Sequence, residues 1–177
     1  MDLQKADFFT VAGFGTKTLF CEKLKLEKKE ITDVLRMRNK NGASLLEESL
    51  SLRKFDIAQL LLDGGIAVNV VTKGNCNELH FIAAHLHEDG AVGIAKQLIE
   101  KGVDLNLPDK KYGNTPFWYL CMSALRKSDE SIMNLIECCM ERKPDIDWKN
   151  NTGRSTRDMV LQRGGKTLIE KVVGKND

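Results

Sequence analysis

A short motif recurs along this chain, and its spacing limits the folds that the chain can adopt. In each copy a glycine is followed two positions later by a small polar residue, and two positions after that by an apolar residue. The copies occupy residues 42–46, 74–79, 113–117 and 153–157. The second copy is longer by one residue, and the fourth has the charged Arg157 at the apolar position. We therefore expect one structural unit to be repeated along the chain.

The distance between the copies indicates what this unit is. The apolar positions Leu46, Leu79 and Phe117 lie 33 and then 38 residues apart. Each of these copies is followed by a second apolar segment and then by an Asn or Asp in a short loop. These loop residues are Asn69, Asn106 and Asp147. A period near 33 residues predicts pairs of helices stacked side by side, and therefore an all-α fold.

Further residues in the units match a known repeat. The second unit carries Leu-His-Phe-Ile-Ala-Ala at residues 79–84, the third carries Thr115-Pro116, and Lys-Gly-Val-Asp-Leu-Asn closes the second unit at residues 101–106. Together with the period, these motifs resemble the ankyrin repeat over about residues 16–173. The resemblance implies an all-α ankyrin-repeat helical solenoid of about five helix-turn-helix units, with degenerate units as N- and C-terminal caps.

The length of 177 residues fits one domain with room for a core. We expect a single ankyrin-repeat domain over residues 1–177. Its parts are an N-terminal cap or degenerate repeat (1–38), three repeats (39–71, 72–108 and 109–149) and a C-terminal cap (150–173). Within the first part we expect a leading helix over residues 1–16, followed by a hairpin of two short helices that forms the degenerate repeat.

Composition and charge narrow the possible partners and compartments. Net charge is +2, divided as +3, −4 and +3 over residues 1–40, 41–140 and 141–177. No segment is basic enough to follow a phosphate backbone, so the charge pattern disfavours nucleic acid as a partner. The sequence contains neither a long apolar run nor a signal peptide. Five scattered cysteines without a Cys-x-x-Cys pair favour free thiols. We expect a cytoplasmic monomer that does not contact membranes.

Three histidines are candidates for a metal site. His80, His85 and His87 do not converge on one helical face, and no fourth ligand completes a set. His80 also stands where the resembled family has a structural histidine that bonds turn backbone. We therefore expect no bound metal.

Two other segments resemble a binding loop and a reactive site, but a purely structural role explains each of them better. Residues 164–167 resemble the end of a phosphate-binding loop, yet its first glycine would fall at Val160 and no strand precedes it. The adjacent Cys138 and Cys139 fit core packing in an apolar helix better than a reactive thiol. We find no pattern for a nucleophile, a carboxylate pair or a cofactor loop, and we expect no cofactor and no enzymatic activity.

The resemblance also implies where a partner would bind. In the resembled family, side chains beside the repeated glycine and on the outward face of each first helix form the concave surface. Carried over to this chain, the protein-binding residues are Lys40, Asn41, Lys73, Asn75, Lys111, Tyr112, Asn114, Trp118, Met122 and Arg154. Aromatic residues, Met and Arg are enriched at protein interfaces. Trp118 fits a position in the core between repeats equally well.

The function expected from these observations is non-enzymatic binding of another protein through the concave face, as in a scaffold or adaptor. An alternative is a bacterial immunity-type protein that neutralises a toxin by direct binding. Neither the partner nor the choice between these two roles follows from the residues. An enzyme is the least favoured class, because a helical solenoid offers a groove and not a closed pocket.

Overall fold

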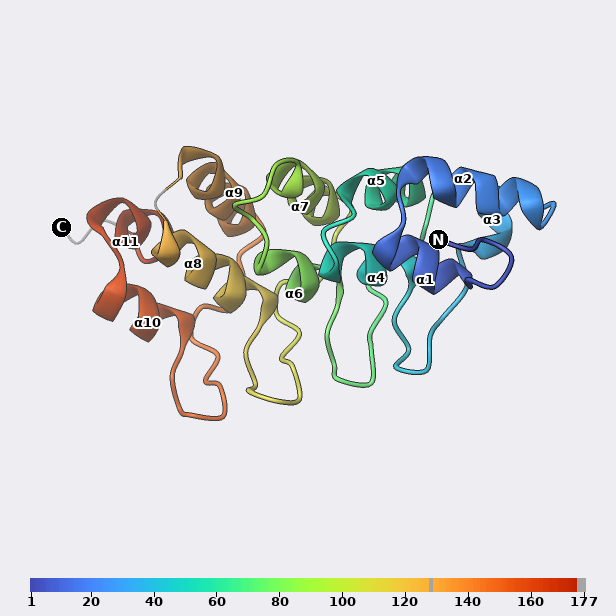
Figure 1. Ribbon diagram of the computed structural model, residues 1–177. Coiled ribbons are helices and arrows are strands. Elements are labelled where there is room, and N and C mark those ends of the chain that lie inside the picture. Colours follow the sequence, from blue (N-terminus) through green and yellow to red (C-terminus); the bar gives the residue numbers. More distant parts are fainter. Residues whose placement is uncertain (128, 175–177) are drawn as a thin grey trace.

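The computed structural model describes residues 1–127 and 129–174, and in this part of the chain every regular element is a helix (Figure 1). The all-α prediction is thereby confirmed. The described helices are α1 (Phe8–Phe14), α2 (Lys17–Leu26), α3 (Ile31–Val34), α4 (Leu45–Ser51), α5 (Phe55–Asp63), α6 (Glu78–Ala83), α7 (Ala91–Glu100), α8 (Pro116–Arg126), α9 (Glu130–Glu141), α10 (Thr156–Arg163) and α11 (Lys166–Val172).

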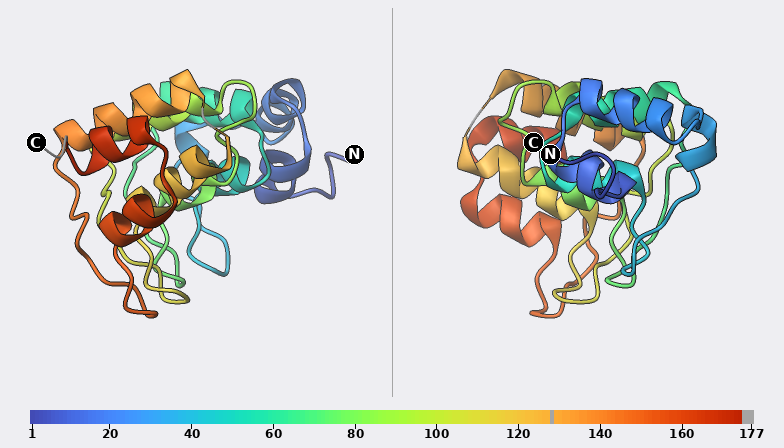
Figure 2. Two further views of the ribbon diagram at one scale, coloured as in Figure 1. Left: turned by 90° about the vertical axis from the view of Figure 1, so that its left-hand side faces the viewer. Right: turned by 45° about the vertical axis from the view of Figure 1, so that its right-hand side comes forward.

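The helices form two rows that run along the length of the molecule (Figures 1 and 2). In the inner row, α1 packs on α4, α4 on α6, α6 on α8, and α8 on α10. In the outer row, α2 packs on α5, α5 on α7, α7 on α9, and α9 on α11. Four loops extend from the inner row to one side of the molecule. Each inner helix therefore contacts its own outer partner and the neighbouring pairs.

The recurring small polar residue of the motif precedes the inner helices α4, α6, α8 and α10. Ser44, Thr115 and Ser155 accept a hydrogen bond from the backbone three residues later, at 3.2, 3.2 and 3.1 Å. Asn77 holds the same place before α6, where its side chain pairs with His80. A side chain at this position satisfies an N–H that has no partner within the helix, and so it fixes where the helix starts.

The repeated apolar position lies in the core. Leu46, Leu79 and Phe117 are fully buried, as predicted, in one continuous apolar cluster. Arg157 occupies the same position in α10 and instead pairs with Asp147 at 2.7 Å. Charge is tolerated there because α10 is the last helix of the inner row among the described residues.

The first helical pair differs from the predicted one. The helices that pair are α1 and α2, which extend the inner and outer rows, while α3 is a four-residue helix before the first loop. The two short helices expected after residue 16 are therefore present, but α2 pairs with α1 and not with α3. Phe8, Val11 and Ala12 give α1 a buried face, whereas α3 buries only Val34.

The second copy of the motif is also in a different register from the predicted one. Asn75, with φ of 58°, takes the left-handed conformation that Gly42 and Gly113 take in other copies, while Gly74 does not. Asn75 lies two residues before the N-cap Asn77, so this copy is not longer than the others. Asparagine tolerates a left-handed backbone better than most residues, which is why a glycine pattern alone misplaced the motif.

Candidate interaction surface

Four loops lie side by side below the inner row: loop 1 (residues 39–44), loop 2 (72–77), loop 3 (109–115) and loop 4 (150–155) (Figures 1 and 2). Main-chain hydrogen bonds of 2.9 Å join each loop to the next. The donors are the N–H groups of Lys73, Lys110 and Asn151, and the acceptors are the carbonyls of Asn41, Gly74 and Tyr112, respectively. The loops therefore form a connected surface together with the inner row, which we call the inner face.

Each loop is closed by the side chain of its first residue. Asn39 Oδ1 accepts from the N–H groups of Asn41 and Ala43, at 2.9 and 3.1 Å. The first residues of the other loops, Thr72, Asp109 and Asn150, accept loop N–H groups in the same way. Polar side chains that bond their own loop backbone hold the tips in one conformation.

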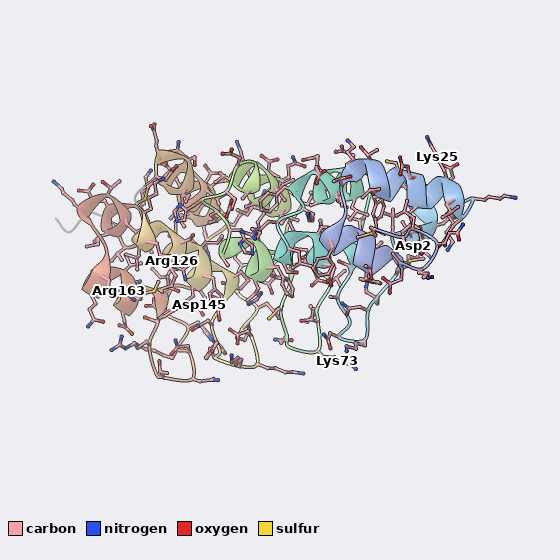
Figure 3. The ribbon with its side chains drawn as sticks, viewed as in Figure 1. Asp2, Lys25, Lys73, Arg126, Asp145 and Arg163 are labelled. Atoms are coloured by element: carbon pink, nitrogen blue, oxygen red, sulfur yellow. The ribbon has the colours of Figure 1, made fainter. Side chains whose placement is uncertain are left out.

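Most of the predicted binding residues lie on this surface. Exposed at or beside the loop tips are Lys40, Asn41, Lys73, Lys111, Tyr112 and Arg154. Figure 3 labels Lys73 at the end of loop 2. The Lys111 ammonium lies 4.6 Å from the centre of the Tyr112 ring, a cation–π contact at the tip of loop 3.

Two of the predicted binding residues are engaged within the chain. The Asn75 side chain donates to the carbonyl of Pro108 at 2.7 Å. Asn114 is buried, donates to Tyr119 Oη at 3.3 Å and accepts from Asn150 Nδ2 at 2.7 Å. Both amides thus join neighbouring loops, and their polar groups are used there.

A groove of about 360 Å³ lies between loop 3 and helices α6 and α8. It brings together Tyr112, Asn114, Trp118 and Met122, all of which were predicted as binding residues. Trp118 and Met122 are partly exposed, so Trp118 is not a fully buried core residue. Tyr119, which follows Trp118 in α8, also lines the groove. Three aromatic rings therefore contribute to its walls.

Sequence reasoning missed two aromatic residues at this end of the inner face. Tyr119 donates from Oη to Asp109 Oδ2 at 3.0 Å, and burial raises the pKa of its hydroxyl to about 12. Trp148 is 45% exposed, and its ring N–H donates to the carbonyl of Gly113 at 3.0 Å. Aromatic residue type was the only signal for either of them, since both positions depend on how loop 3 folds against its neighbours.

The three histidines bond to backbone carbonyls of neighbouring units. The Nε2 atoms of His80, His85 and His87 lie 3.4, 3.1 and 3.2 Å from the carbonyl oxygens of Asn114, Ser51 and Ser123, respectively. Burial lowers the pKa of His80, which keeps its ring neutral at neutral pH. Within residues 1–127 and 129–174, no three metal-ligating side chains gather in one place.

The adjacent cysteines are placed as packing residues. Cys139 is fully buried and burial raises its pKa to about 12, while Cys138 is partly exposed. Burial also raises the pKa of Cys121. A raised pKa keeps Cys121 and Cys139 in the thiol form, which is a poor nucleophile.

Comparisons with known proteins leave the function to be inferred from this geometry. No protein-family model matches the chain, and no curated protein sequence matches it. None of the described helices has the length and apolar character needed to cross a bilayer. The groove beside loop 3 and the row of exposed loop tips are therefore the features on which a functional proposal rests.

Proposed function

We propose that this protein is an ankyrin-type solenoid that binds another protein through its inner face, without catalysing a reaction. The fold part of the proposal is supported by the repeated N-capped inner helices, each paired with an outer helix, and by loops joined through main-chain bonds. Units of this kind contact only their neighbours and leave one long face for binding.

The observation that carries the binding function is the groove beside loop 3. It places Tyr112, Trp118 and Met122 around one depression on the inner face. Aromatic anchors in a pocket, surrounded by a polar rim, are typical of the centre of a protein interface. The exposed Lys40, Asn41, Lys73, Lys111 and Arg154 add polar side chains at the loop tips of the same face, while Asn75 and Asn114 join neighbouring loops.

The test is affinity purification from the native host, followed by calorimetric titration with the protein that is captured. Replacing Tyr112 by Ala should weaken binding by about 2 kcal/mol or more, because the ring is a wall of the groove. Tyr112 is half exposed, so the melting temperature should change little. The control variant is Lys96→Glu, an exposed residue on outer helix α7. The proposal fails if Tyr112→Ala binds normally and Lys96→Glu abolishes binding.

A further inference from the structure

We propose that the groove beside loop 3 binds an apolar side chain from a partner segment that carries aspartate or glutamate next to that side chain. The proposal rests on the proposed function and specifies the chemistry of the partner. It is carried by three observations: the apolar walls of the groove, the arginines around it, and a buried hydroxyl group without a hydrogen-bond partner in the described structure.

The walls of the groove favour an apolar side chain. Tyr112, Trp118, Tyr119 and Met122 contribute rings and a thioether, and α6 adds Ala83 and Ala84. A volume of about 360 Å³ is near the lower end of the range of about 300–1,000 Å³ found for ligand pockets. The groove therefore suits one or two side chains of a peptide segment better than a large cofactor.

The charges around the groove are positive. Arg126, the last residue of α8, lines the groove, and the Arg163 guanidinium lies 3.8 Å from the sulfur of Met122 (Figure 3). The Lys111 ammonium lies over the Tyr112 ring. No aspartate or glutamate is among the residues that line the groove. Within the described part of the chain, neither arginine forms an ion pair.

The nearby acids already have partners. Asp109 accepts from the Tyr119 hydroxyl and from loop N–H groups, and it is buried. Asp147 pairs with Arg157, and Asp158 pairs with Lys149 at 2.6 Å. Arginine binds carboxylates through two parallel hydrogen bonds, so Arg126 and Arg163 are free to bind acids that a partner supplies.

A buried polar group marks the same groove. Ser123 lines it, is 2% exposed, and has no hydrogen-bond partner for Oγ among the described residues. A buried hydroxyl without a partner is destabilising, and such groups are rare in folded proteins. If the side chain turns toward the groove, a backbone amide or carbonyl of the bound segment would satisfy it.

A second groove on the inner face lacks this positive charge. Glu48 and Lys73, which carry opposite charges, line a depression between loops 1 and 2 together with Phe81. Burial raises the pKa of Glu47, which also lines it, to about 8, so this carboxyl is largely neutral at neutral pH. An acidic segment should therefore prefer the groove beside loop 3.

The experiment selects a library of random linear peptides on the intact protein and measures the affinity of selected peptides by fluorescence anisotropy. We expect the selected peptides to have a large apolar residue with Asp or Glu beside it. Arg126→Glu and Arg163→Glu should each weaken their binding by about tenfold or more, whereas Lys96→Glu should not. Changing the acids of one peptide to lysine should abolish its binding to the parent protein. The same lysine-containing peptide should bind the Arg126→Glu variant.

The proposal is overturned if the selection yields no binder, if the binders are not enriched in acids, or if Arg126→Glu leaves their affinity unchanged. Ser123→Ala provides a separate check and should weaken the same peptides, because it removes the hydroxyl. If a captured native partner depends on Tyr112 but not on Arg126 or Arg163, the proposed function stands and this inference fails.

Discussion

Phe117 gives the most direct test of the packing, because its side chain lies between neighbouring helices with no exposed surface. Replacing it with Ala should lower the free energy of unfolding by about 3–5 kcal/mol, through lost burial and the cavity left behind. Denaturant unfolding measures this change. Leu161→Ala is the control. Leu161 is 47% exposed, so its replacement should lower the free energy of unfolding much less. A loss below about 1 kcal/mol for Phe117→Ala would contradict its position in the core.

Because Glu47 is buried, we expect the stability of the protein to fall as the pH rises. It is 1% exposed, Oε2 accepts from the Ser44 N–H, and Oε1 has no partner in the described part of the chain. Burial raises its pKa from 4.5 to about 8, and repulsion from Glu78 adds to the shift, while Arg38 opposes it. The folded state therefore binds this proton more tightly than the unfolded state does.

The sign of the effect follows from these pKa values. The stabilising contribution of Glu47 is fully present below pH 4.5 and is lost as the pH rises through about 8. Glu47→Gln removes the titrating group and should flatten the decline by on the order of 1–3 kcal/mol. The measurement is denaturant unfolding of both proteins between these pH values. Burial also raises the pKa of Glu78, so some slope should remain in the variant. Parallel pH profiles for the two proteins would show that Glu47 ionises freely.

At the scale of the structural elements, loop 3 packs closely against loop 4. Gly113 has φ of +71°, and a Cβ added there would lie 2.6 Å from Asn151 Oδ1 and 3.0 Å from Asn151 N. Gly153 in loop 4 has a similar φ of +74°, but an added Cβ would meet open space. Both positions disfavour L-residues, so their comparison isolates the contact between loops 3 and 4.

We expect Gly113→Ala to lower the free energy of unfolding by about 1 kcal/mol or more beyond the loss caused by Gly153→Ala. Denaturant unfolding of the two variants supplies the numbers. The fluorescence of Trp148 should also change in Gly113→Ala, because its ring N–H donates to the Gly113 carbonyl. Equal losses in both variants would mean that loop 4 moves aside without cost.

The helices could be predicted from the sequence because their signals are local. Capping residues such as Ser44 and Thr115 start a helix through bonds within three residues, and the apolar spacing of Leu46 and Phe117 marks the buried face. The pairing in the first unit was misread because α3 has helical spacing but is only four residues long and buries only Val34. Local pattern therefore predicts where a helix forms better than which partner it packs against.

The groove could be predicted only in part. Tyr112, Trp118 and Met122 were all predicted as binding residues because the resembled family has its concave surface at the corresponding positions. Arg126 and Arg163 were missed because their positions near the groove depend on the length of α8 and on how α10 packs against α8. Such contacts join residues far apart in the sequence, and no spacing rule reports them.

For the molecule as a whole, we expect no dependence on a bound metal. The Nε2 atoms of His80, His85 and His87 are each within hydrogen-bond distance of a backbone carbonyl of another unit. Dialysis against EDTA should therefore leave the melting temperature unchanged, because metal removal destabilises proteins whose folding requires a metal site. A drop of several degrees, reversed by adding zinc, would show that these imidazoles take part in a ligand set.

The nearest-neighbour packing of the two rows has a mechanical consequence. Each inner helix rests on the helices of adjacent pairs, and each loop is bonded to the next loop. Small rotations at successive interfaces add up along such a stack, so its curvature can change while every contact is kept. The molecule should therefore bend elastically. Its curvature would increase or decrease to match the shape of a bound surface, with the deformation spread over all the interfaces between helical pairs.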